Sequence, residues 1–297
     1  MPKLLSKYKN GNYNIKLYDN GTKIRYNHFD KFIPEFSESI DLTITTKCNG
    51  GCEYCYLNCN ENGIHADLND PILDTIHSGT ELAINGNDLS HPDLESFLIK
   101  MKNKRVIVNI TINQKHFIQN INKLKKWQDN KLFWGLGISL TDSTNSQLLD
   151  NINIFNNVVI HVIDGCFTKE DLENLSNHNI KLLILGYKIK GRGVEYYNKN
   201  KEKIDNNIQY LKNHLYDYKH KFSGFGFDNL ATEHLEIRKL VGEEKWNLYH
   251  MGEEGEFTFF IDLVNKKFAI SSLETEMFDM LDNVDDMFKF VRNKQEF

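Results

Sequence analysis

Long hydrophobic runs are missing from this chain of 297 residues, and no apolar stretch approaches the roughly 18 residues of a membrane-spanning helix. The opening segment, MPKLLSKYKNGNYN, has one short apolar pair and no small-residue cleavage site, so we expect no signal peptide. An excess of one charge is missing too, because 36 basic residues face 41 acidic ones. This balance argues against a general attraction to nucleic acid or to anionic membranes. We therefore expect a cytoplasmic protein whose thiols stay reduced.

A regular disulfide framework is also missing, although cysteine itself is present. The five cysteines lie at positions 48, 52, 55, 59 and 166, and four of them fall within one short stretch. An odd count with such crowding suits a metal site better than a set of disulfides.

Alternating polar and apolar residues predict a β-hairpin in residues 1–36. The segment YNIKLYDNGTKIRYN alternates around Asn20 and Gly21, a pair that suits a type I′ turn because both residues tolerate positive φ.

A repeat of strand and helix is predicted for residues 37–221. Six nearly continuous apolar runs are expected as strands of a parallel sheet, each followed by a helix. The expected strands are 40–46, 81–85, 105–113, 133–140, 157–163 and 181–189. The expected helices are 92–103, 116–128, 145–155, 168–178 and 195–218. Such units form either an open doubly wound sheet or an incomplete barrel, and in both the ligands bind at the carboxyl ends of the strands.

The rhythm changes in residues 222–297, which we expect to form a separate extension. The Gly-rich stretch SGFGFDN is followed by a helical segment over 231–250. A second hairpin is predicted in GEFTFFIDLVNKKFAIS, and an amphipathic helix in EMFDMLDNVDDMFKFVRN.

The three cysteines of CNGGCEYC, residues 48–55, follow the first strand of the repeat, at the end where ligands are expected. Three thiolates from one short loop can hold three corners of a metal cluster and leave one position for a ligand. A closed zinc site needs four ligands, usually from two separated pairs, and no second CxxC or HxxxH is present. Cys59 as a fourth ligand keeps a small zinc or redox site open as an alternative. Polar neighbours such as Asn49 and Glu53 disfavour cysteines that are merely buried.

The segment CNGGCEYC resembles the CxxxCxΦC signature of the radical S-adenosylmethionine (SAM) superfamily, with Tyr54 as the aromatic residue. The resemblance implies a [4Fe–4S] cluster bound by Cys48, Cys52 and Cys55, with its fourth iron open to SAM. It implies reductive cleavage of SAM to methionine and a 5′-deoxyadenosyl radical, with a flavodoxin or ferredoxin as electron donor. Soft thiolates select iron–sulfur clusters, in agreement with this assignment. The fold we expect is α/β, an incomplete (β/α)6 TIM-like barrel with an N-terminal hairpin and a C-terminal α+β extension.

The resemblance also implies contacts to SAM. Asn85-Gly86-Asn87-Asp88 stands where family members carry a Gly-Gly-Glu motif that binds the SAM amino group. Gly86 would allow a close backbone approach, and either the amide of Asn87 or the charge of Asp88 would accept the ammonium. The full set of implied SAM contacts is Tyr54, Asn85, Gly86, Asn87, Asp88, Ser139, Ile163, Gly186 and Arg192.

Within that set, the resemblance assigns Ser139 to the ribose or carboxylate and Ile163 to the adenine. Lys188 or Arg192, in LGYKIKGRG, would pair with a carboxylate of SAM or substrate. His161 is expected either to face the interior and touch substrate or to be a hydrogen-bonded core histidine.

The extension resembles in outline the SPASM or twitch regions of peptide-modifying members, but residues 223–297 contain no cysteine for an auxiliary cluster. A plain cap over the barrel is the alternative. We therefore expect an enzyme that acts on a peptide or protein side chain. The alternatives are the same chemistry on a nucleoside or other small molecule, and a non-catalytic iron–sulfur or zinc module.

Overall fold

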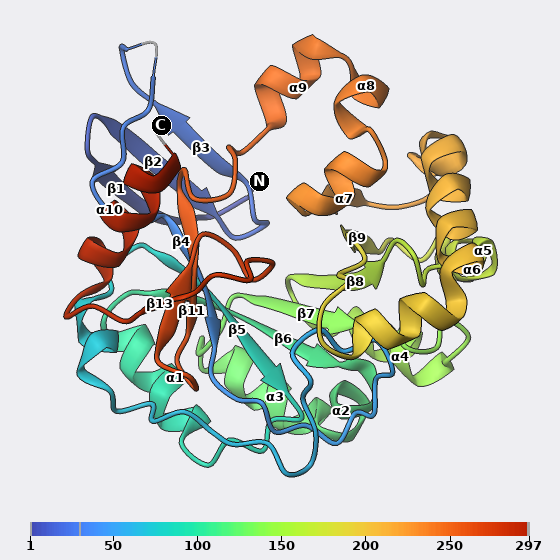
Figure 1. Ribbon diagram of the computed structural model, residues 1–297, viewed down its shortest axis with the longest axis horizontal. Coiled ribbons are helices and arrows are strands. Elements are labelled where there is room, and N and C mark those ends of the chain that lie inside the picture. The colour runs from blue at the N-terminus through green and yellow to red at the C-terminus, as the bar shows by residue number, and fades with distance from the viewer. Residues whose placement is uncertain (1, 30, 296–297) are drawn as a thin grey trace.

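The computed structural model describes residues 2–29 and 31–295 and has a small sheet and a large one (Figure 1). The small sheet contains β1 (Leu4–Asn10), β2 (Tyr13–Tyr18) and β3 (Lys23–Tyr26), all antiparallel. The predicted hairpin of β2 and β3 is confirmed, whereas β1 was not predicted. The predicted type I′ turn is wrong, because Gly21 has positive φ (88°) and Asn20 does not. The amide of Gly21 instead donates to Tyr18 O at 3.0 Å, which closes a three-residue loop with glycine in the left-handed position.

Six parallel strands form the centre of the large sheet, and this prediction is confirmed. They are β4 (Ser39–Thr43), β5 (Glu81–Asn87), β6 (Ile107–Asn113), β7 (Gly135–Ser139), β8 (Val158–Ile163) and β9 (Lys181–Leu185). Neighbours in space are neighbours in sequence, and among the described strands the order never reverses between β4 and β9. A doubly wound sheet needs such a reversal.

Helices connect the strands after β5. They are α1 (Leu94–Asn103), α2 (Gln114–Gln119), α3 (Ile121–Asp129), α4 (Ser146–Ile152), α5 (Lys169–Leu175) and α6 (Arg192–His214), followed by the 3-10 helix η2 (Leu215–Tyr218). The helix predicted over 116–128 is two helices that meet at Asn120. The prediction of a helix after every strand is wrong for β4, which is followed by a long loop and the short 3-10 helix η1 (Pro71–Thr75). Asparagine and glycine, which favour turns, are frequent in that loop.

Residues 222–297 supply strands to both ends of the large sheet. The Gly-rich stretch, for which no strand was predicted, contains β10 (Gly224–Phe227), which is parallel to β9. The predicted second hairpin is confirmed as β11 (Thr258–Asp262) and β12 (Lys267–Ala269). Its first strand pairs in parallel with β4, and β13 (Phe278–Asp279) follows β12 at the edge.

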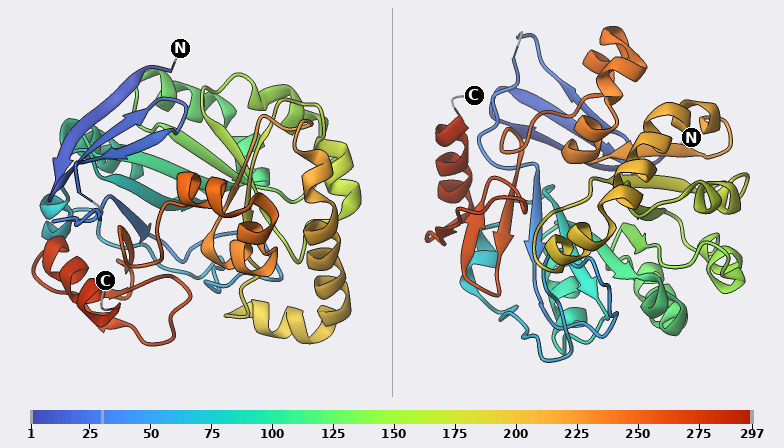
Figure 2. Two further views of the ribbon diagram at one scale, coloured as in Figure 1. Left: turned by 90° about the horizontal axis from the view of Figure 1, so that it is seen from above. Right: turned by 45° about the vertical axis from the view of Figure 1, so that its right-hand side comes forward.

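The helical segments of this region are shorter than expected. Residues 231–250 contain parts of three short helices: α7 (Asn229–His234), α8 (Ile237–Val241) and α9 (Glu243–Tyr249). The predicted amphipathic helix is confirmed only in its second half, as α10 (Val284–Gln295). The small sheet and α10 lie at one end of the large sheet and α6 lies at the other (Figure 2). No described helix is long and apolar enough to cross a membrane.

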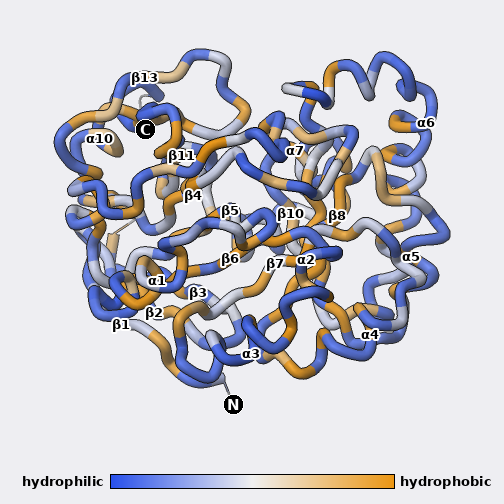
Figure 3. The backbone as a smooth tube through the Cα atoms, turned by 90° about the horizontal axis from the view of Figure 1, so that it is seen from below, coloured by the Kyte–Doolittle hydropathy of each residue, from blue (hydrophilic) through white to orange (hydrophobic). Residues whose placement is uncertain are grey.

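One face of the large sheet packs against the helices and forms the main core. Alternate residues of the central strands, such as Ile84, Ile110 and Ile138, pack with helix residues such as Leu98 and Phe117. Hydrophobic segments accordingly run along the central strands (Figure 3). The residues between them, which point to the opposite face, are mostly polar or small.

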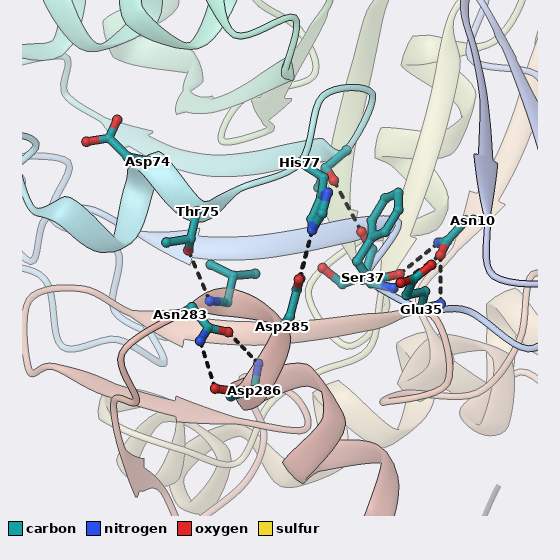
Figure 4. A network of polar contacts seen from close by, with 12 residues as sticks. Asn10, Glu35, Ser37, Asp74, Thr75, His77, Asn283, Asp285 and Asp286 are labelled. Carbon is teal, nitrogen blue, oxygen red and sulfur yellow. Dashed lines mark hydrogen bonds and ion pairs between the residues drawn. The ribbon is translucent and has the colours of Figure 1, made fainter.

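Polar contacts join three segments that are distant in sequence (Figure 4). His77 Nε2 lies 2.9 Å from a carboxylate oxygen of Asp285 on α10, and the His77 ring stacks on Phe36 at 4.1 Å. The side chain of Asn10 donates to Phe36 O at 2.7 Å. Thr75 Oγ1 accepts the first amide of α10, from Val284, at 3.0 Å.

A buried ion cluster joins the small sheet to the amino ends of β4 and β5. Glu38 is fully buried and lies 2.7 Å from Arg25 Nε and 3.2 Å from Lys23 Nζ. Lys23 also pairs with Glu81 at 2.6 Å, and Tyr13 donates its hydroxyl to Glu38. Each charge therefore has an opposite partner, as burial requires.

Candidate functional site

The cysteine loop, residues 45–65, begins two residues after β4, at its carboxyl end. Isolated bridges pair Thr45 with His65 and Lys47 with Asn60, so the loop folds back on itself. The amide of Cys48 donates to Asn60 O at 2.9 Å. The thiols of the loop are free; those at 48, 52 and 55 are half-buried, and that of Cys59 is buried.

Hydrogen-bond donors from neighbouring elements reach the thiols. The amide of Gly50 donates to Cys48 Sγ at 3.3 Å. The side-chain amide of Asn113, at the end of β6, donates to Cys52 Sγ at 3.5 Å. Donors to sulfur stabilise thiolate over thiol, and such contacts tune the ligands of metal sites.

The thiols also affect one another. Burial raises the pKa of Cys48, and the nearby charges of Asp88, Cys52 and Cys55 raise it further. The thiol of Cys59 donates to the sulfur of Cys55 and lowers the pKa of Cys55 to about 6. The four sulfur atoms therefore form one electrostatic group at the end of β4.

Arg192 holds the cysteine loop in place. Its guanidinium donates to Cys52 O at 3.1 and 2.9 Å and to Cys59 O at 2.9 Å, and its backbone amide donates to Cys55 O at 3.1 Å. Gly191 precedes it with φ of 57°, and a Cβ at that position would lie 2.5 Å from Tyr56 O. The sequence predicted Arg192 as a partner of a ligand carboxylate. In the structure its guanidinium is engaged with the carbonyls of the loop.

Asn85 and Asn87 fasten the base of the same loop. The Asn85 side chain accepts the amide of Ile44 and donates to Thr45 O, both at 2.7 Å, so it extends the β4–β5 pairing. Asn87, in the left-handed conformation (φ 48°), donates to Thr45 O at 3.3 Å, to Lys47 O at 3.1 Å and to Cys59 Sγ at 3.5 Å. Both amides therefore stabilise the loop.

Gly86 and Asp88 lie beside these asparagines and differ in what they contact. A Cβ at Gly86 would lie 2.6 Å from Ile110 Cγ2, so packing against β6 explains the glycine without a ligand. Asp88 lies near the thiol of Cys48, whose pKa its charge raises, and accepts the amide of Ser90 at 3.0 Å. Asp88 therefore places a carboxylate directly after β5, near the cysteine loop.

Ser139, His161 and Ile163 lie on the face of the sheet that is free of the core helices. The strand register places Ser139 beside Asn113 of β6 and His161 of β8. A Cβ at Gly137 would collide with the His161 ring and lie 2.9 Å from Thr111 Oγ1. Burial lowers the pKa of His161 to about 4, so its imidazole is neutral at pH 7. Within the described residues no hydrogen bond to its ring is found.

Three further predicted residues lie around this region. The amide of Gly186 donates to Asp228 at 2.9 Å, and a Cβ there would lie 2.8 Å from Ala231 N, so this glycine packs on α7. Tyr54 packs edge-on against Tyr196 of α6, with ring centroids 5.5 Å apart. Lys188 donates to Ser272 Oγ at 2.8 Å and lies over the ring of Tyr56 at 4.3 Å.

Asp41, in the middle of β4, was missed by the sequence analysis. Its side chain is exposed to solvent on the helix-free face, in register with Ala83. Protein nevertheless surrounds the carboxyl group: burial raises its pKa to about 6, Glu254 and Asp228 raise it further, and Lys188 opposes them. In the sequence, Asp41 is an acidic residue inside the apolar run IDLTITT, which was predicted to be a strand. A carboxylate within such a buried strand is the pattern from which this residue could have been found.

The thiols suit an iron–sulfur cluster in their chemistry. Half-buried thiols from one loop, with N–H donors beside them, are the donor type that such clusters use. Within residues 2–29 and 31–295, no three Cys, His, Asp or Glu side chains are arranged around a point as ligands of a single metal ion.

Comparison with known proteins gives no relative: no family model matches the chain, and no curated protein matches its sequence. The resemblance to radical SAM enzymes therefore depends on the residues of this chain.

Proposed function

We propose that this chain is a radical SAM enzyme whose single [4Fe–4S] cluster is held by Cys48, Cys52 and Cys55. The observation that carries the proposal is the position and support of the cysteine loop. It leaves the carboxyl end of a central parallel strand, where α/β sheets bind ligands. Side chains from β5, β6 and the start of α6 hold it there.

The proposed fold is an incomplete barrel. The strands β4 to β10 are parallel and sequential, and β11 lies parallel to β4 on its other side. This order supports a (β/α) barrel that stays open, with β10 at one edge of the sheet and β12 and β13 beyond β11 at the other. The face with Asp41, Ser139 and His161 would then be the interior, where the substrate and the nucleoside of SAM bind.

The proposed roles of the residues follow from their contacts. Asp88 binds the ammonium of SAM, because its carboxylate lies near Cys48 and the amides of Asn85 and Asn87 are engaged with the loop. Ser139 and Ile163 contact the nucleoside. When bound, the cluster and SAM supply reductive cleavage of a carbon–sulfur bond and a radical that abstracts hydrogen from substrate. The protein positions SAM, excludes water and takes its electron from a flavodoxin or ferredoxin.

The substrate we propose is a peptide or protein side chain, and the alternative is a nucleoside or another small molecule. One observation favours a second function, a non-catalytic module with four sulfur ligands. Cys59 is buried and its thiol is hydrogen-bonded to Cys55, so it is close enough to serve as a fourth ligand of zinc or of a closed cluster.

Anaerobic reconstitution with iron and sulfide separates the two functions. The enzyme should bind a cluster and, once reduced, release 5′-deoxyadenosine from SAM. Replacing Cys48, Cys52 or Cys55 with alanine should abolish that release, whereas Cys59→Ala and Cys166→Ala should retain it. Loss of cluster assembly in Cys59→Ala alone would contradict the three-ligand assignment.

A further inference from the structure

The arm, residues 229–251, contains helices α7 to α9 and is only partly packed on the rest of the protein. All residues of α9 are described, and none of them is buried. Leu248 and Tyr249 are each 70% exposed, and Met251 is 45% exposed. In Figure 1, α8 and α9 project beyond the large sheet. Helices in proteins are stabilised mostly by burying an apolar face, so an arm with exposed apolar residues indicates a partner.

A groove of about 900 Å³ runs along the arm and could accommodate part of such a partner. Apolar side chains of Leu230, Trp246 and Leu273 line it. The Trp246 ring stacks on His250, with centroids 4.2 Å apart, and Arg238 lies 5.7 Å from the Trp246 ring. The groove therefore offers an ordered aromatic surface to an apolar side chain.

The charged lining of the groove is acidic. Five glutamates line it, with one arginine and one lysine. The two cations are already paired inside the lining: Arg238 with Glu243 at 2.7 Å, and Lys239 with Glu236 at 3.4 Å. The glutamates beyond these two pairs are Glu233, Glu253 and Glu254, of which Glu253 lies 3.2 Å from His250 Nε2. An acidic surface attracts cationic partners and repels phosphates, so a nucleic acid is a poor occupant.

The groove adjoins the candidate site. Glu254 lines the groove, and its charge also raises the pKa of Asp41 on the helix-free face of β4. The pKa of Glu254 itself is raised, first by burial and then by the charges of Asp228 and Glu274. Glu254 therefore lines the groove and is also close enough to Asp41 for their charges to interact.

From these observations we propose that the groove binds a basic peptide segment of another protein, with lysine or arginine beside an aromatic or aliphatic residue. Trp246 contacts the apolar residue, and Glu233 and Glu253 contact the cations. Modification of the bound peptide rests on the proposed radical SAM function, whereas binding of the peptide to the groove does not.

Fluorescence anisotropy with the full chain tests the docking. The probes are a labelled peptide of alternating lysine, leucine and phenylalanine and a matched peptide with glutamate in place of lysine. The basic peptide should bind at least about tenfold more tightly than the acidic one, and added salt should weaken it. Equal binding of the two peptides would overturn the proposal.

Charge reversal locates the site. The double variant Glu233→Lys, Glu253→Lys should weaken binding of the basic peptide by about tenfold or more. Glu202→Lys, at an exposed position of α6 away from the groove, is the matched control and should change it little. Trp246→Phe should retain part of the affinity, and Trp246→Ala should lose it. An effect of the control equal to that of the groove variant would contradict the assignment.

Two further measurements distinguish peptide docking from the cluster chemistry and from self-association of the chain. Release of 5′-deoxyadenosine without peptide should be unchanged in the groove variants, so a failure of the cluster chemistry and a failure of docking give different results. Sedimentation of the free chain should show a monomer. Self-association that Leu248→Ser abolishes would assign the arm to a second copy and overturn the peptide proposal.

Discussion

Loss of Arg192 should release the cysteine loop. Its guanidinium donates to two carbonyl oxygens of that loop, those of Cys52 and Cys59. A hydrogen bond from a charged group contributes about 1.5–3 kcal/mol, and the lower value suits a half-buried side chain. Two acceptors then give about 3 kcal/mol, which is roughly a hundredfold in the opening equilibrium of the loop.

Hydrogen exchange measured by mass spectrometry, on the metal-free protein, tests this magnitude. In Arg192→Met, peptides that contain the amide of Cys48 should exchange about a hundredfold faster, because loop opening breaks its bond to Asn60. The exchange rate of this amide in Arg192→Lys should fall between those of the unchanged chain and of Arg192→Met, since an ammonium lacks the planar fork that spans both carbonyls. Arg238→Met removes an exposed guanidinium and should leave the loop unchanged. Unaltered exchange in Arg192→Met would refute the supporting role.

Three other predictions concern stability. Glu38→Gln should lower the free energy of unfolding by about 3–5 kcal/mol in urea titrations, because it leaves Arg25 buried without its carboxylate and Lys23 with Glu81 alone; a loss below about 1 kcal/mol would contradict this. Gly137→Ala should cost about 1–3 kcal/mol by crowding His161, and the added change His161→Ala should recover part of it in thermal melts. The raised pKa of Asp41, about 6, means that the folded chain binds its proton more tightly than the unfolded chain. Stability should therefore fall as pH rises from about 4 to 6, and Asp41→Asn should flatten that slope; an unchanged slope would show that Asp41 does not titrate in this range.

Local patterns predicted the central strands well because each strand carries its own apolar run. The position of the cysteine loop also followed, since it depends only on the order of a strand and a motif. By contrast, β10 was missed because its sequence, GFGF, has weak strand propensity and gains its order by pairing with β9.

Contacts between distant residues could not be predicted in the same way. The pairing of β11 with β4 joins residues more than two hundred positions apart, and no local pattern marks it. The contact of Arg192 with the cysteine loop is likewise through space, 140 residues away in sequence. The same limit applies to Gly86, whose neighbour Ile110 belongs to the next strand.

Mössbauer spectroscopy of the anaerobically reconstituted protein tests the central claim most directly. We predict a [4Fe–4S] cluster in which one iron changes its signal when SAM is added, in the native chain and in Cys59→Ala alike. Absence of iron, or a cluster whose irons are all bound by side chains and do not respond to SAM, would contradict the account.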